Sequence, residues 1–419
     1  MNTKTLFSRA SVAEVQDRDV TVPLVGSPEF FRDPYPTYRW LREQSPLVSL
    51  RPNVRACTRY KDCLRVLRDP RFSARRYMRP IEHYTNEQRS QLATWVRVAF
   101  HQVIFTDPPD HTRLRSLLMR AFSTEAIERL VPRIENLFLE ILDDIRPGVE
   151  FDFMSSIAQR FPAIVIGELL GIPRDGWDHL MRWCDAFMEF FTTVPAPFAL
   201  SLEAQQATIE LIKYMQPLVE RRKSQAAGDF ISMLLQASHE GHTLTTEELL
   251  AQCALLLVAG HETTRNLLGN ALHTLLRHPS AITRLRQDSS LTRSAVEEIL
   301  RFQGPVQGIS RVVATPCKLF EETLEPGHTI IMLVASANRD PVQFPDPDRF
   351  DIERKHNTHL TFGAGSHTCL GSYLARLEAR IAITMLLRRY QRIELCEPDP
   401  TWTETLLIRG PERFNVVCE

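Results

Sequence analysis

One cysteine stands among glycines in the segment HLTFGAGSHTCLGSYLAR, residues 359–376. Glycines such as Gly365 and Gly371 allow positive φ and close backbone approach, so the loop can direct its N–H groups at the sulfur of Cys369. A helix predicted to begin just after this loop would bring its positive end to the same sulfur and lower the pKa of the thiol. A thiolate is one axial ligand that haem iron accepts, and Phe362 could pack beside it. The alternatives are a turn over a buried thiol and a reactive cysteine.

A second unusual stretch lies inside a long apolar helix predicted over residues 246–277. Thr245 and Glu248 have capping-box spacing at its start, and Pro279 follows its end. In its middle, AGHETT at residues 259–264 brings a glycine and a charge into an apolar run. Helix propensity alone would not select these residues. Taken in isolation, a solvated glutamate on a surface turn of helix explains the stretch.

Two further pairs of side chains share a helical face. His111 and Arg115 are four residues apart in DPPDHTRLRSLL, and Glu298 and Arg301 are three apart in SAVEEILRF. Glu297 would pair with Arg301 equally well by spacing. An exposed polar turn or a surface ion pair accounts for each of them without any chemistry.

The elements that must position these side chains are mainly helices. Helical apolar spacing predicts helices over residues 34–46, 60–68, 111–121, 125–144, 155–170, 177–191, 202–224, 246–277, 292–302 and 372–389. Strands are predicted over residues 47–58, 311–315, 329–334 and 403–418. Between residues 338 and 371, proline, aspartate and glycine exclude long elements, and such a long irregular segment is typical of a functional one. The predicted fold is therefore mainly α with small peripheral sheets.

The composition narrows the class of protein. The chain has 419 residues and a formal net charge of −1, which gives no global field for nucleic acid. No run of 18 apolar residues predicts a membrane anchor, and the polar N-terminus lacks a signal peptide, so we expect a cytoplasmic protein. The eight cysteines include no Cys-x-x-Cys pair, so we expect neither disulfides nor a zinc site. Without a linker-like or repeated segment, we expect one large domain.

The cysteine loop reads FGxGxHxCxG over residues 362–371. This pattern resembles the haem-binding loop of the cytochrome P450 superfamily, and the resemblance extends from DPYPTYRWLREQSPL near the start to RGPERF near the end. The chain looks like a member of the soluble bacterial class. The resemblance implies a single cytochrome P450 domain over residues 1–419 that acts as a haem-thiolate monooxygenase, with haem b as cofactor and Cys369 as the axial ligand of its iron.

The resemblance also assigns roles to polar residues. Glu262 and Thr263 match the acid–threonine pair of the superfamily's oxygen-binding helix, which steers protons while dioxygen is activated, and Thr264 is the alternative hydroxyl. In that helix a glycine, here Gly260, widens the groove. Haem propionates are implied to bind His111, Arg115, Arg311 and His367. Other implied haem contacts are Ala259, Gly260, Phe362, Gly363 and Gly371.

Glu298 and Arg301 match the superfamily's Glu-x-x-Arg element. There the glutamate bonds with an arginine of the segment that precedes the haem loop, and FPDPDRF supplies this arginine as Arg349. The resemblance gives this triad a structural role beneath the haem and no catalytic one.

Segments that line the distal pocket in the superfamily fall here near residues 76–104 and 183–200, at Pro305 to Gln307 and near Leu406. The apolar residues predicted for this pocket are Phe187, Phe190, Phe191, Phe198, Val306 and Leu406. Aromatic residues at helical spacing are as often ordinary core residues, and this alternative stays open. An apolar pocket fits a hydrophobic substrate such as a polyketide-like, terpenoid, steroid or fatty-acid-derived compound.

No reductase segment accompanies the superfamily-like sequence. The resemblance therefore implies that electrons come from NAD(P)H through a separate ferredoxin or flavodoxin and its reductase. Arg113, Arg376 and Arg380 are candidates for a local basic patch where that partner docks, and we expect a monomer. Two alternatives are a peroxide-driven peroxygenase and a haem-thiolate sensor or ligand-binding protein without turnover.

Overall fold

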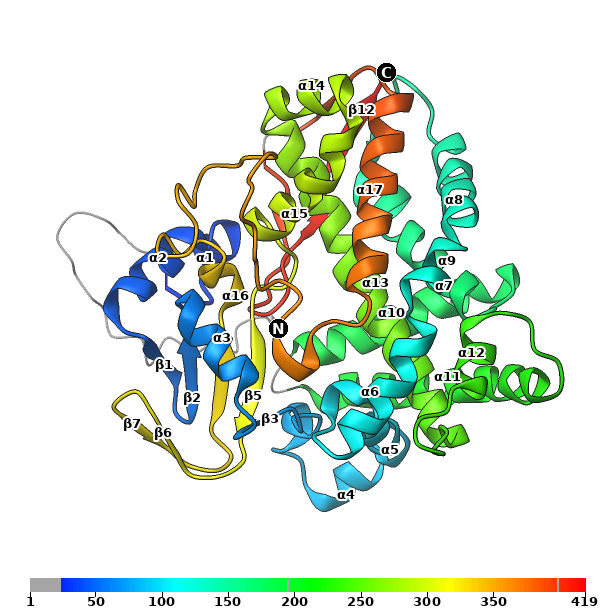
Figure 1. Ribbon diagram of the computed structural model, residues 1–419, viewed down its shortest axis with the longest axis vertical. Coiled ribbons are helices and arrows are strands. Elements are labelled where there is room, and N and C mark those ends of the chain that lie inside the picture. The colour runs from blue at the N-terminus through cyan, green and yellow to red at the C-terminus, as the bar shows by residue number, and fades with distance from the viewer. Residues whose placement is uncertain (1–23, 194–195, 398) are drawn as a thin grey trace. The chain divides into compact units, whose positions relative to one another are not determined.

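Helical apolar spacing does form helices through most of the chain (Figure 1). The computed structural model describes residues 24–193, 196–397 and 399–419. These residues group into two compact units, each described here by itself. The helical unit consists of residues 74–293, 369–397 and 413–419. The sheet unit consists of residues 24–73, 294–368 and 399–412.

The helical unit is built around α13 (Thr246–Leu276), the long helix that the sequence predicts. Thr245 and Glu248 form the expected capping box at its start. Around it lie α4 (Asn86–Ser90), α5 (Ala93–His101), α6 (Asp110–Ala121), α7 (Thr124–Glu128), α8 (Val131–Asp143), α9 (Arg160–Leu169), α10 (Trp177–Thr192), α11 (Phe198–Ser224), α12 (Phe230–Gln236), α14 (Pro279–Gln287) and α17 (Ser372–Arg389). A small antiparallel sheet has the order β4 (Phe151–Asp152), β12 (Asn415–Cys418), β9 (Ile393–Leu395).

Two predicted helices of this unit differ in detail. The helix predicted over residues 125–144 is two helices, α7 and α8, because Pro132 lies in the first turn of α8, where proline begins a helix. The helix predicted over residues 155–170 starts as a π-helical turn, Met154–Ala158, which runs into α9. Such turns are rare and occur frequently at functional sites.

The sheet unit carries a five-stranded sheet in the order β1, β2, β8, β5, β3. Its strands are β1 (Leu47–Arg51), β2 (Val54–Cys57), β3 (Phe72–Ser73), β5 (Ile309–Val313) and β8 (Thr329–Met332). β2 and β8 are parallel, and the other pairs are antiparallel. The strand predicted over residues 47–58 is a hairpin, since Asn53 at φ 60° turns the chain between β1 and β2.

Short elements complete the sheet unit. Its helices are α1 (Pro28–Arg32), α2 (Tyr35–Gln44), α3 (Tyr60–Arg68), α15 (Thr292–Phe302) and α16 (Val334–Ala337). Its hairpins are β6 (Cys317–Leu319) with β7 (Glu322–Leu324), and β10 (Thr401–Trp402) with β11 (Pro411–Arg413). The strand predicted over residues 403–418 is two short strands, β11 and β12. The irregular segment predicted over residues 338–371 contains only a 3-10 turn, Gly365–His367.

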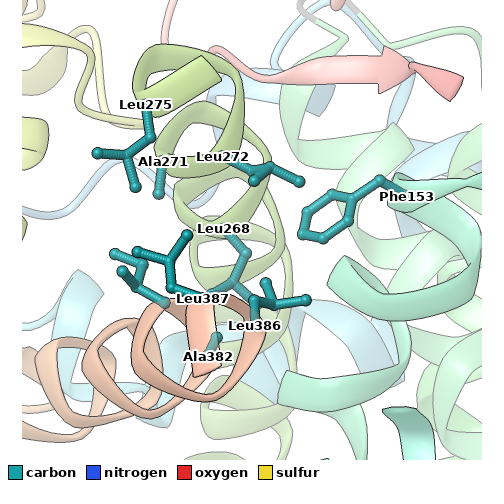
Figure 2. A pocket seen from close by; sticks show the side chains of 9 residues that line it. Phe153, Leu268, Ala271, Leu272, Leu275, Ala382, Leu386 and Leu387 are labelled. Carbon is teal, nitrogen blue, oxygen red and sulfur yellow. The ribbon is translucent and has the colours of Figure 1, made fainter. Parts of the chain in front are cut away.

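A small apolar cavity lies where α13 packs on α17 in the helical unit (Figure 2). Its volume is about 10 Å³, room for about one water molecule. Its lining is entirely apolar: Phe153, Leu268, Ala271, Leu272, Leu275, Ala382, Ile383, Leu386 and Leu387. A water there would have no hydrogen-bond partner in this lining, so we expect the cavity to stay dry.

We expect Leu272→Ala, which enlarges this cavity, to lower the free energy of unfolding by about 2–5 kcal/mol. Leu272 is 5% exposed, so its loss removes packing that neighbours cannot fully replace. Denaturant unfolding of the holoprotein measures the change. Leu202→Ala on α11 is the control, because Leu202 is 37% exposed and should lose far less. Equal losses for the two variants would contradict this description of the core.

Candidate functional site

The face of α13 that carries Ala259 and Thr263 is left partly open. Most of α13 is buried, yet Ala259 is exposed, and Leu255 and Thr263 are half-buried. These three residues are spaced four apart and so lie on one face of the helix. An exposed residue in the middle of a mostly buried helix indicates that this face of the helix is accessible to a ligand.

The two neighbouring threonines have different surroundings. The hydroxyl of Thr263 donates a hydrogen bond of 2.7 Å to the carbonyl oxygen of Ala259, one helical turn back. Its oxygen can still accept a hydrogen bond from a water or a bound ligand. Thr264 is 3% exposed and packs in the interior. Of the two hydroxyls, only that of Thr263 is therefore available on the open face.

Glu262 is held by two side chains one turn further along α13. Nη1 of Arg265 lies 3.0 Å from Oε1 of Glu262, and Nδ2 of Asn266 donates to the same oxygen at 2.9 Å. Both the carboxylate and the guanidinium are mostly covered, with 13% and 17% of the side chains exposed. Arg265 and Asn266 are not among the residues predicted from the sequence, although spacings of three and four from Glu262 are the signal for such contacts.

Gly260 lies where α9 packs on α13. A Cβ atom at this position would lie 2.7 Å from Cδ1 of Ile166 on α9. The missing side chain therefore lets α9 approach α13 closely. The groove-widening role that the resemblance implies for this glycine stays a prediction.

Cys369 is exposed, but its thiol does not have the lowered pKa that the sequence predicts. Although Cys369 is exposed by surface area, the protein atoms packed around its thiol raise the pKa of that thiol above its usual value. The backbone N–H of Gly371 and the charges of Arg115 and Arg376 act in the opposite direction without cancelling the burial. The thiol is therefore neutral at pH 7, and a metal ion that binds the sulfur must displace its proton.

The loop glycines divide into two kinds. Gly363 and Gly365 have φ values of 69° and 76°, which favour glycine. A Cβ on Gly365 would also lie 2.8 Å from the carbonyl oxygen of Leu67. Gly371, in contrast, caps α17 at φ −81°, a conformation open to any residue. Gly371 therefore does not use the positive φ that a glycine allows.

The four residues implied to bind propionates lie two in each unit. In the helical unit, α6 carries His111, which is 2% exposed, and Arg115, whose pKa is lowered by burial and raised by Cys369. In the sheet unit, Arg311 on β5 is 5% exposed and His367 is half-buried. Nη1 of Arg311 donates to the carbonyl oxygen of Ser310 at 2.9 Å.

The buried ion-pair network of the sheet unit contains Glu298 and Arg301, as expected. Nη2 and Nε of Arg301 lie 2.7 and 2.8 Å from the two Glu298 oxygens, and neither side chain is exposed. The third member is Arg354, whose Nε lies 3.1 Å from Oε2 of Glu298. The assignment of Arg349 is wrong: this residue offers its backbone carbonyl to Arg301 and Arg354. Asn357 donates a further bond to Glu298 at 3.1 Å.

The aromatic residues predicted for a substrate pocket are partly core residues. Phe187 and Phe190 are 3% and 1% exposed and belong to the apolar core of the helical unit, so the core alternative holds for both. The side chain of Phe191 lies outside the described residues. In the sheet unit, Val306 and Leu406 are half-buried, so both reach the surface of that unit.

The expected basic patch is only partly available. Arg113 pairs with Glu248, whose carboxylate also belongs to the capping box of α13. Arg376 donates to the carbonyl oxygen of Ser372 at 3.2 Å, and Arg380 is exposed.

Among the described residues, no helix is long and apolar enough to cross a membrane. All eight cysteines are free thiols, as the sequence predicts.

Comparison with known proteins assigns the chain to one family. A family model described as "Cytochrome P450" matches residues 87–416. The cytochrome P450 monooxygenase PikC of Streptomyces venezuelae is 38% identical, over 91% of this chain and 90% of its own. A cytochrome P450 of Chondromyces apiculatus has a TM-score of 0.85 at 33% identity, with 94% and 97% of the chains covered.

The structure of P450BioI in complex with an acyl carrier protein that bears hexadec-9Z-enoic acid has a TM-score of 0.86 at 33% identity, covering 94% and 99% of the chains. The predicted fold, mainly α with small sheets, is thus confirmed. By sequence and by fold, the chain belongs to the cytochrome P450 family of haem-thiolate monooxygenases.

Proposed function

We propose that this cytochrome P450 hydroxylates or epoxidises a hydrophobic small molecule, with Cys369 as the ligand of the haem iron. The observation that carries the proposal is the exposed thiol of Cys369, which lies within electrostatic reach of Arg115 and Arg376. The open face of α13, with Ala259 and Thr263, supports a ligand site in the same helical unit.

The residues of this unit fit haem b in their chemistry. A thiol can bind iron once deprotonated, and half-buried cations such as Arg115 can pair with propionate carboxylates. We assign the same role to His111 and, in the sheet unit, to Arg311 and His367. We assign Phe362, Gly363, Gly371, Ala259 and Gly260 as haem contacts. When bound, haem supplies the iron at which dioxygen is activated.

Glu262 and Thr263 are assigned the handling of protons. The Glu262 carboxylate accepts bonds from Arg265 and Asn266 and is 13% exposed, so it has access to solvent while it is held in place. The Thr263 oxygen can fix a water on the open face, because its own proton is donated to Ala259. A carboxyl that exchanges protons with such a water is a general acid placed beside the ligand site.

We expect Thr263→Ala to raise peroxide release per NAD(P)H consumed by about threefold or more, since a proton-directing hydroxyl is lost. The measurement compares peroxide, product and NAD(P)H in one assay with a surrogate ferredoxin and its reductase. Thr264→Ala is the control and should leave this ratio unchanged, because Thr264 is buried. If only Thr264→Ala raises peroxide, the hydroxyl role belongs to Thr264.

The substrate is proposed to be a product of secondary metabolism, free or bound to a carrier. Relatedness to P450BioI, whose structure contains an acyl carrier protein that bears hexadec-9Z-enoic acid, supports the carrier-bound form. A titration of the holoprotein with free apolar metabolites, and separately with acyl carrier proteins that bear acyl chains, tests the proposal through the shift of the haem absorption band. A shift with free compounds alone would exclude a need for the carrier.

Electrons are proposed to come from NAD(P)H through a ferredoxin or flavodoxin and its reductase. The exposed Arg380 supports docking of an acidic partner on the helical unit.

We further propose a cytoplasmic monomer with a single cytochrome P450 domain over residues 1–419. A sensor without turnover would need no acid–threonine pair, and the held carboxylate of Glu262 therefore favours the enzyme.

A further inference from the structure

His261 is a buried histidine with one open ring nitrogen. It lies on α13 next to Glu262 and is 0% exposed. Its Nε2 is 3.0 Å from the carbonyl oxygen of Gln159, the residue between the π-helical turn and α9. A carbonyl only accepts hydrogen bonds, so Nε2 carries the ring proton and Nδ1 is a bare acceptor. Among the described residues, no protein atom donates a hydrogen bond to this Nδ1.

An exposed carboxylate, that of Asp185, lies near the buried His261. His261, Glu262 and Arg265 share one side of α13, because successive residues turn by about 100° along a helix. Asp185 on α10 lies within electrostatic reach of all three. Asp185 is exposed by surface area, although the protein around it raises the pKa of its carboxyl, chiefly through burial and also through Glu262.

A buried acceptor without a protein partner normally holds an ordered water. Two carboxylates lie within electrostatic reach of the His261 imidazole, Asp185 from α10 and Glu262 from α13. The imidazole itself stays neutral, since burial is the main effect on His261 and lowers its pKa. His261 is thus suited to hold a water in place and unsuited to carry the proton itself.

We propose that Nδ1 of His261 fixes a buried water through which protons pass from Asp185 to Glu262. In each transfer Asp185 takes a proton from solvent and gives it to the water, which releases another proton to a carboxylate oxygen of Glu262. Asp185 returns to its carboxylate, and His261 keeps its Nε2 proton. His261 is therefore a positioning residue. This proposal rests on the proposed function of Glu262 and Thr263.

Two variants of His261 test the roles of its two ring nitrogens separately. His261→Asn retains an acceptor near Nδ1 and loses the Nε2 bond to Gln159, whereas His261→Gln retains the donor and loses the acceptor. We expect His261→Gln to lower product per NAD(P)H at least about threefold and to enlarge the solvent deuterium isotope effect, and His261→Asn to restore most of the coupling. The reverse ranking, with His261→Gln like the parent, would show a purely structural anchor and overturn the proposal.

Asp185→Asn tests the solvent-exposed end of the proposed proton path. It should lower coupling as His261→Gln does, and the double variant should be no worse than either single one, because both act on one path. Additive losses would contradict a shared path. A crystal structure of the holoprotein gives a readout without turnover: a water within hydrogen-bond distance of Nδ1 is expected, and an empty Nδ1 would overturn the proposal.

The same assay distinguishes failure of the proposed water route from failure of the proposed function. If Thr263→Ala releases peroxide and His261→Gln does not, the water route fails and the proposed function stands. If neither Thr263→Ala nor Glu262→Gln changes coupling, the proposed function of the acid–threonine pair fails as well.

Discussion

Cys369→Ser is expected to abolish substrate oxidation and the thiolate signature of the haem spectrum. Serine has nearly the same size, but its hydroxyl is far less acidic than a thiol and does not donate electron density to iron as sulfur does. The neighbouring charges of Arg115 and Arg376 are too weak to deprotonate even the thiol at neutral pH, since burial keeps its pKa raised. They will not deprotonate an alcohol.

Cys396→Ser is the matched control for this variant. Cys396 is the other exposed cysteine, and it lies just after β9, outside the loop. We expect its product formation and spectrum to match the parent. A Cys369→Ser protein that retains the thiolate spectrum, with loss in Cys396→Ser, would place the iron ligand at Cys396.

Glu298→Ala is expected to lower the free energy of unfolding by about 3–5 kcal/mol, because it strands buried guanidinium groups. Glu298 accepts hydrogen bonds from Arg301, Arg354 and Asn357, and neither Glu298 nor Arg301 is exposed. Arg301 also donates to the carbonyl oxygen of Asn338, at the start of the irregular segment that leads to the cysteine loop. Denaturant unfolding of the holoprotein, monitored in the sheet unit, measures the loss.

The neighbouring glutamate provides the control. Glu297 bonds with His359 at 3.2 Å and its side chain is 27% exposed, so Glu297→Ala should cost much less than Glu298→Ala. Arg354→Ala should destabilise the protein more than Arg349→Ala, because only Arg354 reaches Glu298 through its side chain. Similar losses for the two glutamates, or for the two arginines, would contradict the network described here.

The helices could be predicted well because their signals are local. The capping box of Thr245 and Glu248 and the apolar spacing after it give the start and length of α13 almost to the residue. The strands were harder, since β3 and β4 contain two residues each and exist only through pairing with distant segments. The turn at Asn53 shows the same limit: no local glycine marks it, and pairing of β1 with β2 fixes it.

The residue types that form the site could be predicted more reliably than the contacts that each residue makes. Arg349 and Arg354 lie in one irregular segment, and only the three-dimensional path of that segment decides which of them reaches Glu298. The pKa of Cys369 was predicted in the wrong direction because burial, which a sequence does not reveal, outweighs the local charges. The role of Gly260 depends on Ile166, almost a hundred residues away in the sequence.

The proposed function depends above all on Cys369, which is proposed to provide a thiolate to haem iron. The most direct measurement is the absorption spectrum of the reduced holoprotein with carbon monoxide. We expect the strongly red-shifted band of thiolate-ligated haem in the parent and its loss in Cys369→Ser. A parent spectrum with only the band of haem bound by a neutral ligand, under conditions that saturate the protein with haem, would contradict thiolate ligation by Cys369.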